Sequence, residues 1–220
     1  MTERDYNELD CVCALDLETS GLNEQKDQIL EVAAIFGSIK DGKFTERKRF
    51  VRVLPLITNI EDWDEKVVEM HSANGLIAEA LKAKKADTYE NAFSRCDREL
   101  QGNAPSLPTY KARWTLLGNS VHFDLRFVRR VFPVFAGHLS HRVIDVSSTR
   151  LFCEGLGMAT EHTTPPHRAL PDVLSSITQY EAQSEWVRLL GAAGITGHVL
   201  SAAMLDEERL GRTAVGHGAG

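Results

Sequence analysis

The 220-residue sequence predicts an α/β fold, in which a mixed β-sheet with an antiparallel three-stranded start is flanked by helices. Apolar, β-rich runs come first and are joined by turn signals. A charged stretch with apolar residues at helical spacing follows. Short apolar runs then alternate with helical segments, which is the order typical of α/β domains.

The first half of the chain contains three predicted strands and then helices. The strands are the apolar, β-rich runs over residues 11–17, 29–39 and 44–53. The Asp41-Gly42 pair between the second and third runs is a strong signal for a tight hairpin. Residues 64–100 have the apolar spacing of two or three helices, and the Gly- and Pro-rich residues 102–110 predict a loop.

The second half alternates strands and helices. The expected elements are a strand from Trp114, a helix from His122 to near Pro133, a strand over residues 142–146, a loop over 154–166 and a helix over 170–190. Three glycines then interrupt the pattern. We therefore expect a tail over residues 1–10, one domain over 11–190, and an extension over 191–220 with a helix at 198–212 and a disordered end.

Composition and charge limit the classes of function. The chain is 43% hydrophobic and 25% charged, as in ordinary soluble globular proteins. A net charge of -6 argues against a protein that coats long nucleic acids, but is compatible with a local pocket for a short polyanion. The four cysteines show no CxxC pair and no zinc spacing, which favours a reducing compartment. We expect no membrane association and a cytoplasmic location, with the mitochondrion as alternative, because the sequence has no membrane-spanning run and an acidic N-terminus.

Four acidic residues and one histidine, in three blocks, are the candidates for catalysis. Asp16 and Glu18 lie two apart at the end of the first predicted strand, so their side chains share one face. Asp124 lies in GNSVHFD, and His167 and Asp172 lie in HRALPD. Carboxylates that converge on one point repel each other unless cations neutralise them, and such ligands suit Mg²⁺ or Mn²⁺. Two such ions and a histidine make a site for water attack on a phosphodiester.

Each block alone has a simpler interpretation. A single D-x-E at a strand end is commonly solvated, and Asp124 suits the first turn of a helix because of the helix dipole. The loop histidine His167 is one of eight histidines. Ser120 is either a turn residue or a hydroxyl donor to phosphate. The presence of all three blocks in this order favours the metal-dependent site.

Together the blocks resemble the motifs of the DEDDh exonuclease family, and among its members the oligoribonucleases most. DLETSGL resembles the first motif, GNSVHFDLRF the second, HRVIDVSS the segment that follows, and HRALPDVLSSI the third, across roughly residues 11–185. The resemblance implies a ribonuclease H-like fold and 3′–5′ hydrolysis of short RNA to nucleoside 5′-monophosphates. It also implies that the four acids hold two metal ions and that His167 is the general base.

The resemblance further implies residues that bind substrate. These are Leu22, Trp63, His71, Ser120, Arg142 and Ser147. Leu22 would wedge against a base, the two serines and His71 would contact phosphate, and Arg142 would reach the partner's site in a homodimer. The tryptophan belongs to a segment that looks like the family's middle motif. Simpler roles compete from the residues alone: packing for Leu22 and the tryptophan, an ion pair for Arg142, and a capping role for His71.

One departure from the family pattern bears on the substrate. His141 precedes Arg142 where family members usually carry a tyrosine that caps the short substrate across the dimer. A broader exonuclease for RNA 3′ ends or single-stranded DNA is therefore the alternative enzyme. A non-catalytic module that binds nucleic acid or protein is the alternative outside enzymes, and the five filled catalytic positions argue against it.

Overall fold

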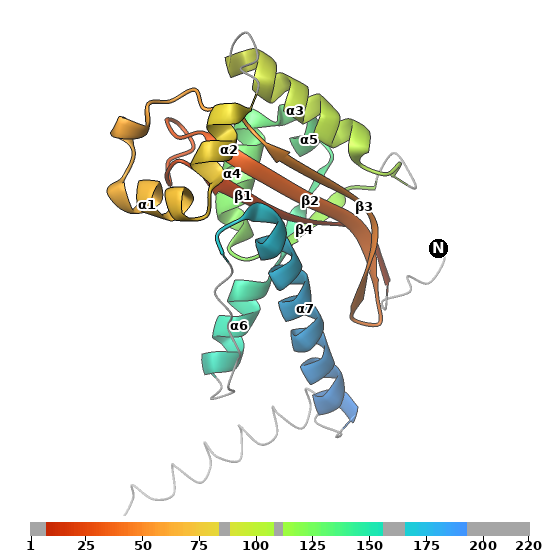
Figure 1. The fold of residues 1–220 in the computed structure, drawn as a ribbon. Coiled ribbons are helices and arrows are strands. Elements are labelled where there is room, and N and C mark those ends of the chain that lie inside the picture. The colour runs from red at the N-terminus through yellow and green to blue at the C-terminus, as the bar shows by residue number, and fades with distance from the viewer. Residues whose placement is uncertain (1–7, 84–88, 108–111, 156–165, 193–220) are drawn as a thin grey trace, which may run out of the picture. The chain divides into compact units, whose positions relative to one another are not determined.

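The computed structural model describes residues 8–83, 89–107, 112–155 and 166–192 (Figure 1). Its elements in chain order are β1 (Glu8–Thr19), β2 (Ile29–Lys40), β3 (Lys43–Val53), η1 (Ile60–Asp62), α1 (Glu65–Ala73), α2 (Leu76–Lys82), α3 (Tyr89–Asn103), β4 (Trp114–Gly118), α4 (Val121–Val131), α5 (Pro133–Ala136), β5 (Leu139–Asp145), α6 (Val146–Gly155) and α7 (Ala169–Ala192). The chain divides into two compact units, Met1–Glu181 and Ala182–Gly220. The sheet and the candidate site lie in the first unit. The described part of the second continues α7 and contains an Arg188–Glu185 ion pair of 2.8 Å.

The sheet has five strands in the order β3-β2-β1-β4-β5. β1, β2 and β3 pair antiparallel, whereas β4 runs parallel to β1 and β5 runs parallel to β4. The predicted mixed sheet with an antiparallel start is therefore confirmed. The hairpin between β2 and β3 turns through Asp41 and Gly42, whose φ angles of 49° and 77° are both positive, as a type I′ turn requires.

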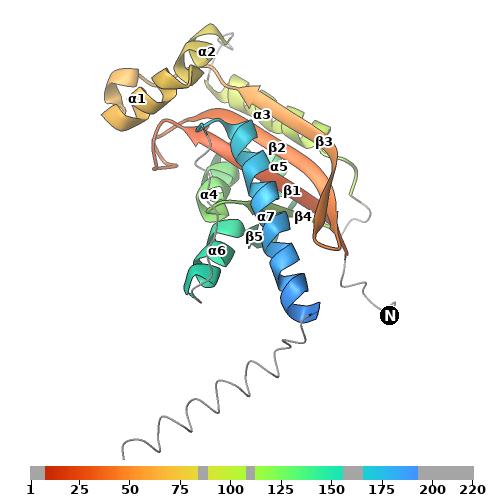
Figure 2. The same ribbon diagram turned by 60° about the horizontal axis from the view of Figure 1, so that its bottom comes forward.

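Helices cover both faces of the sheet. On one face Cys13 and Leu15 of β1 belong to a core with residues of α3, α4 and α5, in which the rings of Phe36 and Trp114 meet edge to face at 5.0 Å. On the other face Ala14 of β1 packs with the first turns of α7. Figure 2 shows α7 in front of the strands and α3 behind them. Because successive strand residues alternate between faces, β1 presents its even-numbered residues to α7.

A close approach of backbones fixes where β1 and β4 separate. The two strands pair only from Val12 to Ala14 of β1. A Cβ atom on Gly118, the last residue of β4, would lie 2.8 Å from the carbonyl oxygen of Leu15, so only glycine fits there. The chain then turns through Ser120 at a φ of 52° and begins α4 beside the end of β1.

The structure corrects several predicted boundaries. The strand expected over residues 142–146 is β5, Leu139–Asp145, and the following residue already begins α6, which the sequence did not predict. The β-branched Val143 and Val146 favoured a strand that continues through residue 146, but Asp145 ends it by accepting the N–H of Ser147 at 3.0 Å and of Ser148 at 3.2 Å, as a helix cap does.

Other boundaries differ by a few residues. α3 and α7 extend through Gly102 and Gly191, where the sequence predicted breaks, and the short α5 was not predicted. Three helices form between residues 64 and 103, as expected. Most of the predicted N-terminal tail, the loop at 154–166 and the C-terminal extension lie outside the described residues. Within the described ranges no helix is long and apolar enough to cross a bilayer.

Candidate active site

Three carboxylates meet where β1 ends against the start of α7. Asp16 and Glu18 are even-numbered residues of β1 and therefore face α7, whose first turn carries Asp172. Each of the three residues offers an oxygen atom, and these atoms lie within 4.8 Å of one another. The structure thus brings three of the four predicted acids close together.

The fourth acid, Asp124, reaches the same place from α4. Its side chain is only 3% exposed, and its Oδ1 accepts the backbone N–H of Leu17 at 3.0 Å. β1 and β4 pair no further than Ala14, so β4 does not supply an acceptor for the N–H group of Leu17. The side chain of Asp124 supplies it instead. The negative charge of Asp124 is also one of the causes that raise the pKa of Asp16.

Burial and mutual repulsion make this cluster costly to ionise. Burial, followed by the charge of Asp124 and the other nearby acids, raises the pKa of Asp16 well above its ordinary value. Burial and the charge of Asp172 raise the pKa of Glu18 to about 8. Burial also raises the pKa of Asp172. Without a cation these carboxyl groups therefore bind protons more readily than isolated ones do, and a divalent ion can take the place of those protons.

The donor set fits a hard divalent cation. All four side chains offer carboxylate oxygens, which are the ligands that Mg²⁺ and Mn²⁺ favour. Oδ1 of Asp172 is buried and accepts no hydrogen bond from the described residues, so a lone pair is available at the cluster. Buried polar atoms are almost always paired, and a bound cation would satisfy this one.

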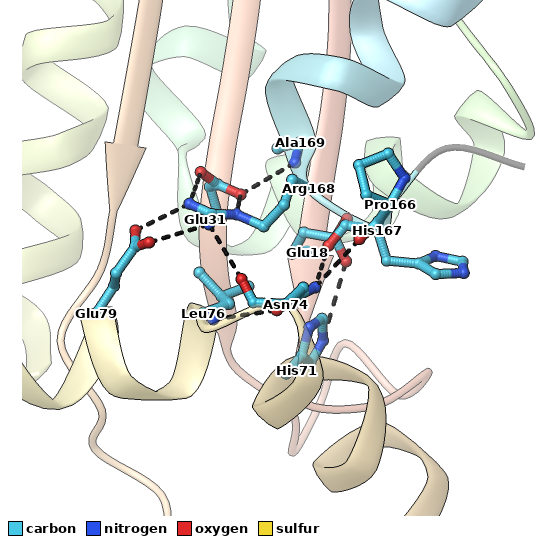
Figure 3. A network of polar contacts seen from close by, with 10 residues as sticks. All are labelled: Glu18, Glu31, His71, Asn74, Leu76, Glu79, Pro166, His167, Arg168 and Ala169. Atoms are coloured by element: carbon cyan, nitrogen blue, oxygen red, sulfur yellow. Dashed lines mark hydrogen bonds and ion pairs between the residues drawn. The ribbon is translucent and has the colours of Figure 1, made fainter.

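His167 lies at the rim of the cluster, in the segment directly before α7. It is exposed, and its φ of 52° is unusual for a residue other than glycine. It stands five residues before Asp172 in the chain, and its charge opposes the rise in the pKa of Asp172. The imidazole ring points away from His71 and Asn74 (Figure 3). The structure thus brings Asp16, Glu18 and Asp172 together, holds Asp124 at Leu17 between two of them in the chain, and leaves the histidine exposed.

Two predicted phosphate contacts lie together at the start of α4 and α6. The hydroxyl oxygens of Ser120 and Ser147 are 3.3 Å apart. Asp145 holds them in place, because its Oδ1 accepts the N–H of Ser120 at 3.2 Å and the hydroxyl of Ser147 at 2.6 Å. Both interpretations of Ser120 are therefore compatible with the structure: it forms the turn, and its side chain stays exposed.

The remaining predicted substrate residues differ in accessibility. Leu22 is 77% exposed just beyond β1, and Arg142 is exposed on the edge strand β5. Trp63 is half-buried, and its Nε1–H donates to Thr58 Oγ1 at 3.0 Å. His71 is fully buried, which does not fit the expected phosphate contact.

His71 instead supports the end of β1. Its Nε2 lies 3.1 Å from the carbonyl oxygen of Thr19 and 3.9 Å from Glu18 Oε2. Burial lowers the pKa of the ring, so it remains neutral at physiological pH. A neutral ring in this position orients the strand end that carries Glu18.

The structure also adds functional candidates that the sequence did not single out. Glu31 on β2 is 3% exposed and accepts two hydrogen bonds from Arg168, which also binds Glu79 of α2 (Figure 3). Asn74, between α1 and α2, contacts the backbone of His167. The sequence contains one indication that Glu31 has a special role, because it is a single charged residue inside the apolar run ILEVAAIF. Nothing in the pattern around Asn74 or Glu79 indicated their partners.

The chain is similar in sequence to nucleases. Residues 13–180 match a family model described as "RNase_T: Exonuclease". The mitochondrial oligoribonuclease of Homo sapiens is 30% identical over 173 residues, which cover 76% of this chain and 69% of that protein. The oligoribonuclease of Streptomyces coelicolor is 30% identical over 180 residues, which cover 79% of this chain and 84% of that protein.

The fold has the same kind of relatives. The zinc-bound complex of Escherichia coli exonuclease I with single-stranded DNA superposes with a TM-score of 0.57 at 18% identity. The match covers 88% of this chain but only 45% of exonuclease I, so this chain spans about half the length of that protein. The likeness shows that the two proteins share a fold, which bears out the predicted ribonuclease H-like class.

The raised pKa values predict how stability depends on pH without metal. Between the ordinary pKa of Glu18, 4.5, and its folded value of about 8, the folded state binds more protons than the unfolded state. This contribution to stability is present below pH 4.5 and declines as pH rises through about 8, by roughly 1.4 kcal/mol per pH unit for each such group.

We therefore expect the Tm of chelator-treated protein to fall between about pH 4.5 and about pH 8, and saturating Mg²⁺ or Mn²⁺ to raise the Tm most at the upper end of this range. Differential scanning calorimetry across this range measures both effects. Asp124→Asn, which removes one charge and keeps an acceptor for Leu17, should reduce the pH dependence. A Tm that is independent of pH and metal would contradict the convergence of four ionisable carboxylates.

Proposed function

The chain belongs to the exonuclease family, and from this premise we propose that it is a 3′–5′ exoribonuclease that degrades short oligoribonucleotides to nucleoside 5′-monophosphates. The observation that carries the proposal is the convergence of acidic side chains from β1, α4 and α7 on one point. The relatives named oligoribonucleases support the choice of a short RNA as substrate.

In this proposal Asp16, Glu18, Asp124 and Asp172 hold two divalent cations, Mg²⁺ or Mn²⁺. Their oxygens are the donors that these ions prefer, and the buried Oδ1 of Asp172, which has no hydrogen-bond partner among the described residues, supports the assignment. When bound, such ions lower the pKa of a water molecule and stabilise negative charge on a phosphodiester and its leaving oxygen. Asp124 also keeps the end of β1 in place through Leu17, so its carboxylate is positioned before any ion binds.

His167 is the proposed general base. It is exposed beside Asp172, where it can accept the proton of the attacking water on the solvent side of the acids. A positioned histidine of this kind contributes on the order of 10²–10⁴ to the rate. The neighbouring carboxylate of Asp172 stabilises the imidazolium ion that forms when the proton is transferred.

Residues around the acids are proposed to hold the substrate. The adjacent hydroxyls of Ser120 and Ser147 would donate to a phosphate, and the exposed side chain of Leu22 would pack against a base. Trp63 would form the rim of the site through its fixed indole. His71 is not among the proposed phosphate contacts because its ring is buried.

We also propose a homodimer that uses the β5–α6 edge. Three apolar side chains are exposed there: Val143 at 40%, Leu151 at 63% and Phe152 at 68%. These exposed apolar side chains on two consecutive elements are the basis for proposing a protein–protein contact at this edge. Arg142 lies on the same edge strand and would reach the partner's site.

A second candidate function is a broader exonuclease that also trims longer RNA or single-stranded DNA. The exposed His141 favours it, because histidine stands where the resemblance calls for a capping tyrosine. A non-catalytic binding module is not favoured, since all four acids are present and converge. A cytoplasmic location stays a prediction, and several of the similar proteins are named mitochondrial.

Substrate length decides between the two enzymatic functions. We expect 5′-labelled RNAs of about two and five nucleotides to be degraded much faster than one of about twenty, and a chelator to abolish all cleavage. Product analysis by gel or chromatography gives the rates. Efficient trimming of the twenty-mer, or of a DNA of the same length, would support the broader exonuclease instead.

Asp124→Asn tests the role of the acids. Asparagine keeps an acceptor for the N–H of Leu17, so the variant should fold, but it removes a charge that the metal ions need. We expect hydrolysis of short RNA to fall by at least about 100-fold and calorimetry to show weaker Mn²⁺ binding. Glu99→Gln, which removes a carboxylate on α3 that pairs with Arg52, is the matched control and should retain activity. Equal activity of Asp124→Asn and the wild type would refute the metal assignment.

Replacement of Phe152 tests the dimer. Phe152→Asp places a charge on the proposed contact, so light scattering should show the mass of one chain where the wild type shows two. Val187→Asp changes a residue of similar exposure, 67%, on α7 and should leave the mass unchanged. A wild-type mass of one chain at micromolar concentration would rule out the proposed homodimer.

A further inference from the structure

The backbone at His167 is strained and requires support. Its φ of 52° lies in the left-handed region, which residues with a Cβ atom adopt only at an energetic cost. Strained residues of this kind persist where the surrounding structure fixes them, and they are frequent at active sites. Two sets of contacts fix the segment around His167, one on its carbonyl group and one on the next residue (Figure 3).

The first set comes from the side chain of Asn74. Its Nδ2 donates to the carbonyl oxygens of His167 at 2.5 Å and Pro166 at 3.4 Å. Its Oδ1 accepts the N–H of Leu76 at 3.0 Å, in the first turn of α2. Because the oxygen is engaged by a donor, the orientation of the amide group is determined, and its NH₂ group faces the carbonyl oxygens of the His167 segment.

The second set comes from Arg168. Its Nε and one terminal nitrogen donate to the two oxygens of Glu31 at 2.9 and 3.0 Å, and its terminal nitrogens donate to the two oxygens of Glu79 at 3.0 and 2.9 Å. Glu31 also accepts the N–H of Ala169 at 3.0 Å. Such forked pairs fix geometry as well as charge. Arg168 is therefore anchored from two sides directly after His167.

These anchors belong to the framework that carries the acids. Glu31 on β2 is the register partner of Glu18 on β1. Asn74 follows α1, whose His71 contacts both Thr19 and Glu18 at the end of β1. The position of the His167 segment is thus tied to the same strand that positions two of the four carboxylates.

We propose that Asn74 and Arg168 are positioning residues, which together hold His167 in its strained conformation at the rim of the carboxylate cluster. This proposal rests on the proposed function, in which His167 is the general base. Neither residue needs to touch substrate or metal. Asn74 restrains the carbonyl side of His167, and Arg168 restrains the following residue through Glu31 and Glu79.

Two variants remove these contacts and are chosen to leave the fold intact. Asn74→Asp keeps the acceptor for Leu76 and loses both donors to the His167 segment. Arg168→Lys keeps the positive charge and loses the fork. Asn74→Asp changes the local charge and Arg168→Lys does not. A loss of kcat that both variants show therefore arises from the altered position of His167 and not from the change in charge. The matched controls are Asn103→Asp, which loses a donor to the carbonyl of Glu99, and Arg49→Lys, which loses a fork to Glu46.

We expect each variant to lower kcat on a short RNA by about 10-fold to about 100-fold, with KM and Mn²⁺ affinity changed by less than about twofold. In a His167→Ala background the same changes should have almost no further effect, because residues that act through one group are non-additive. Amide hydrogen exchange of His167, Arg168 and Ala169 should be faster in both variants than in the wild type and the controls.

The results that would overturn the proposal are specific. Equal losses of kcat with and without His167 would show that the two residues act through the fold or the metals. Unchanged exchange at residues 167–169 together with unchanged kcat would show that Asn74 and Arg168 do not hold the segment. If the wild type fails to cleave RNA, the proposed function fails, and the exchange measurement still decides whether Asn74 and Arg168 hold His167.

Discussion

The repulsion between buried carboxylates is the constraint on which the rest of this structure depends. Asp16, Glu18, Asp124 and Asp172 come from three separate segments, and the pKa values of all four are raised. A fold gains nothing from such a cluster by itself, since each buried charge loses hydration. Arg168, the nearby cation, is bonded to Glu31 and Glu79 and not to the four acids. The arrangement becomes favourable when divalent cations bind, which fits a chain that belongs to a family of exonucleases.

Topology explains how the cluster forms at the end of β1. β4 runs parallel to β1 but pairs with it over three residues only, and Gly118 lets the chain leave the sheet close to Leu15. The helix that follows, α4, must then begin beside β1. This places Oδ1 of Asp124 where it accepts the N–H of Leu17. From the other face, the first turns of α7 pack on β1 through Ala169, and Asp172 follows one turn later. The acids converge because packing on both faces of one strand fixes the two helices.

The sequence predicts the parts of this site that depend on local periodicity. The common direction of Asp16 and Glu18 follows from the alternation of a strand, and the mixed sheet follows from the order of apolar runs. The burial of His71 and the link between Glu31 and Arg168 could not be predicted in this way. Both depend on the register between β1 and β2 and on the packing of α1 and α2, which are tertiary features. α6 was missed because Val146 favours a strand, whereas the cap formed by Asp145 decides the boundary.

The two kinds of catalytic group require opposite environments, and the structure provides both within one turn of α7. Carboxylates that hold cations work best where water is scarce, because electrostatic interactions are stronger there. A general base must meet water and exchange its proton with solvent, so it has to stay exposed. Asp172 is half-buried on the helix, and His167 is exposed in the segment before it. An exposed side chain lacks the packing that holds a core residue, so its position has to be fixed through the backbone. The contacts of Asn74 and Arg168 do this without covering the imidazole, which explains why the polar network surrounds the chain at His167 while its ring remains free to meet solvent.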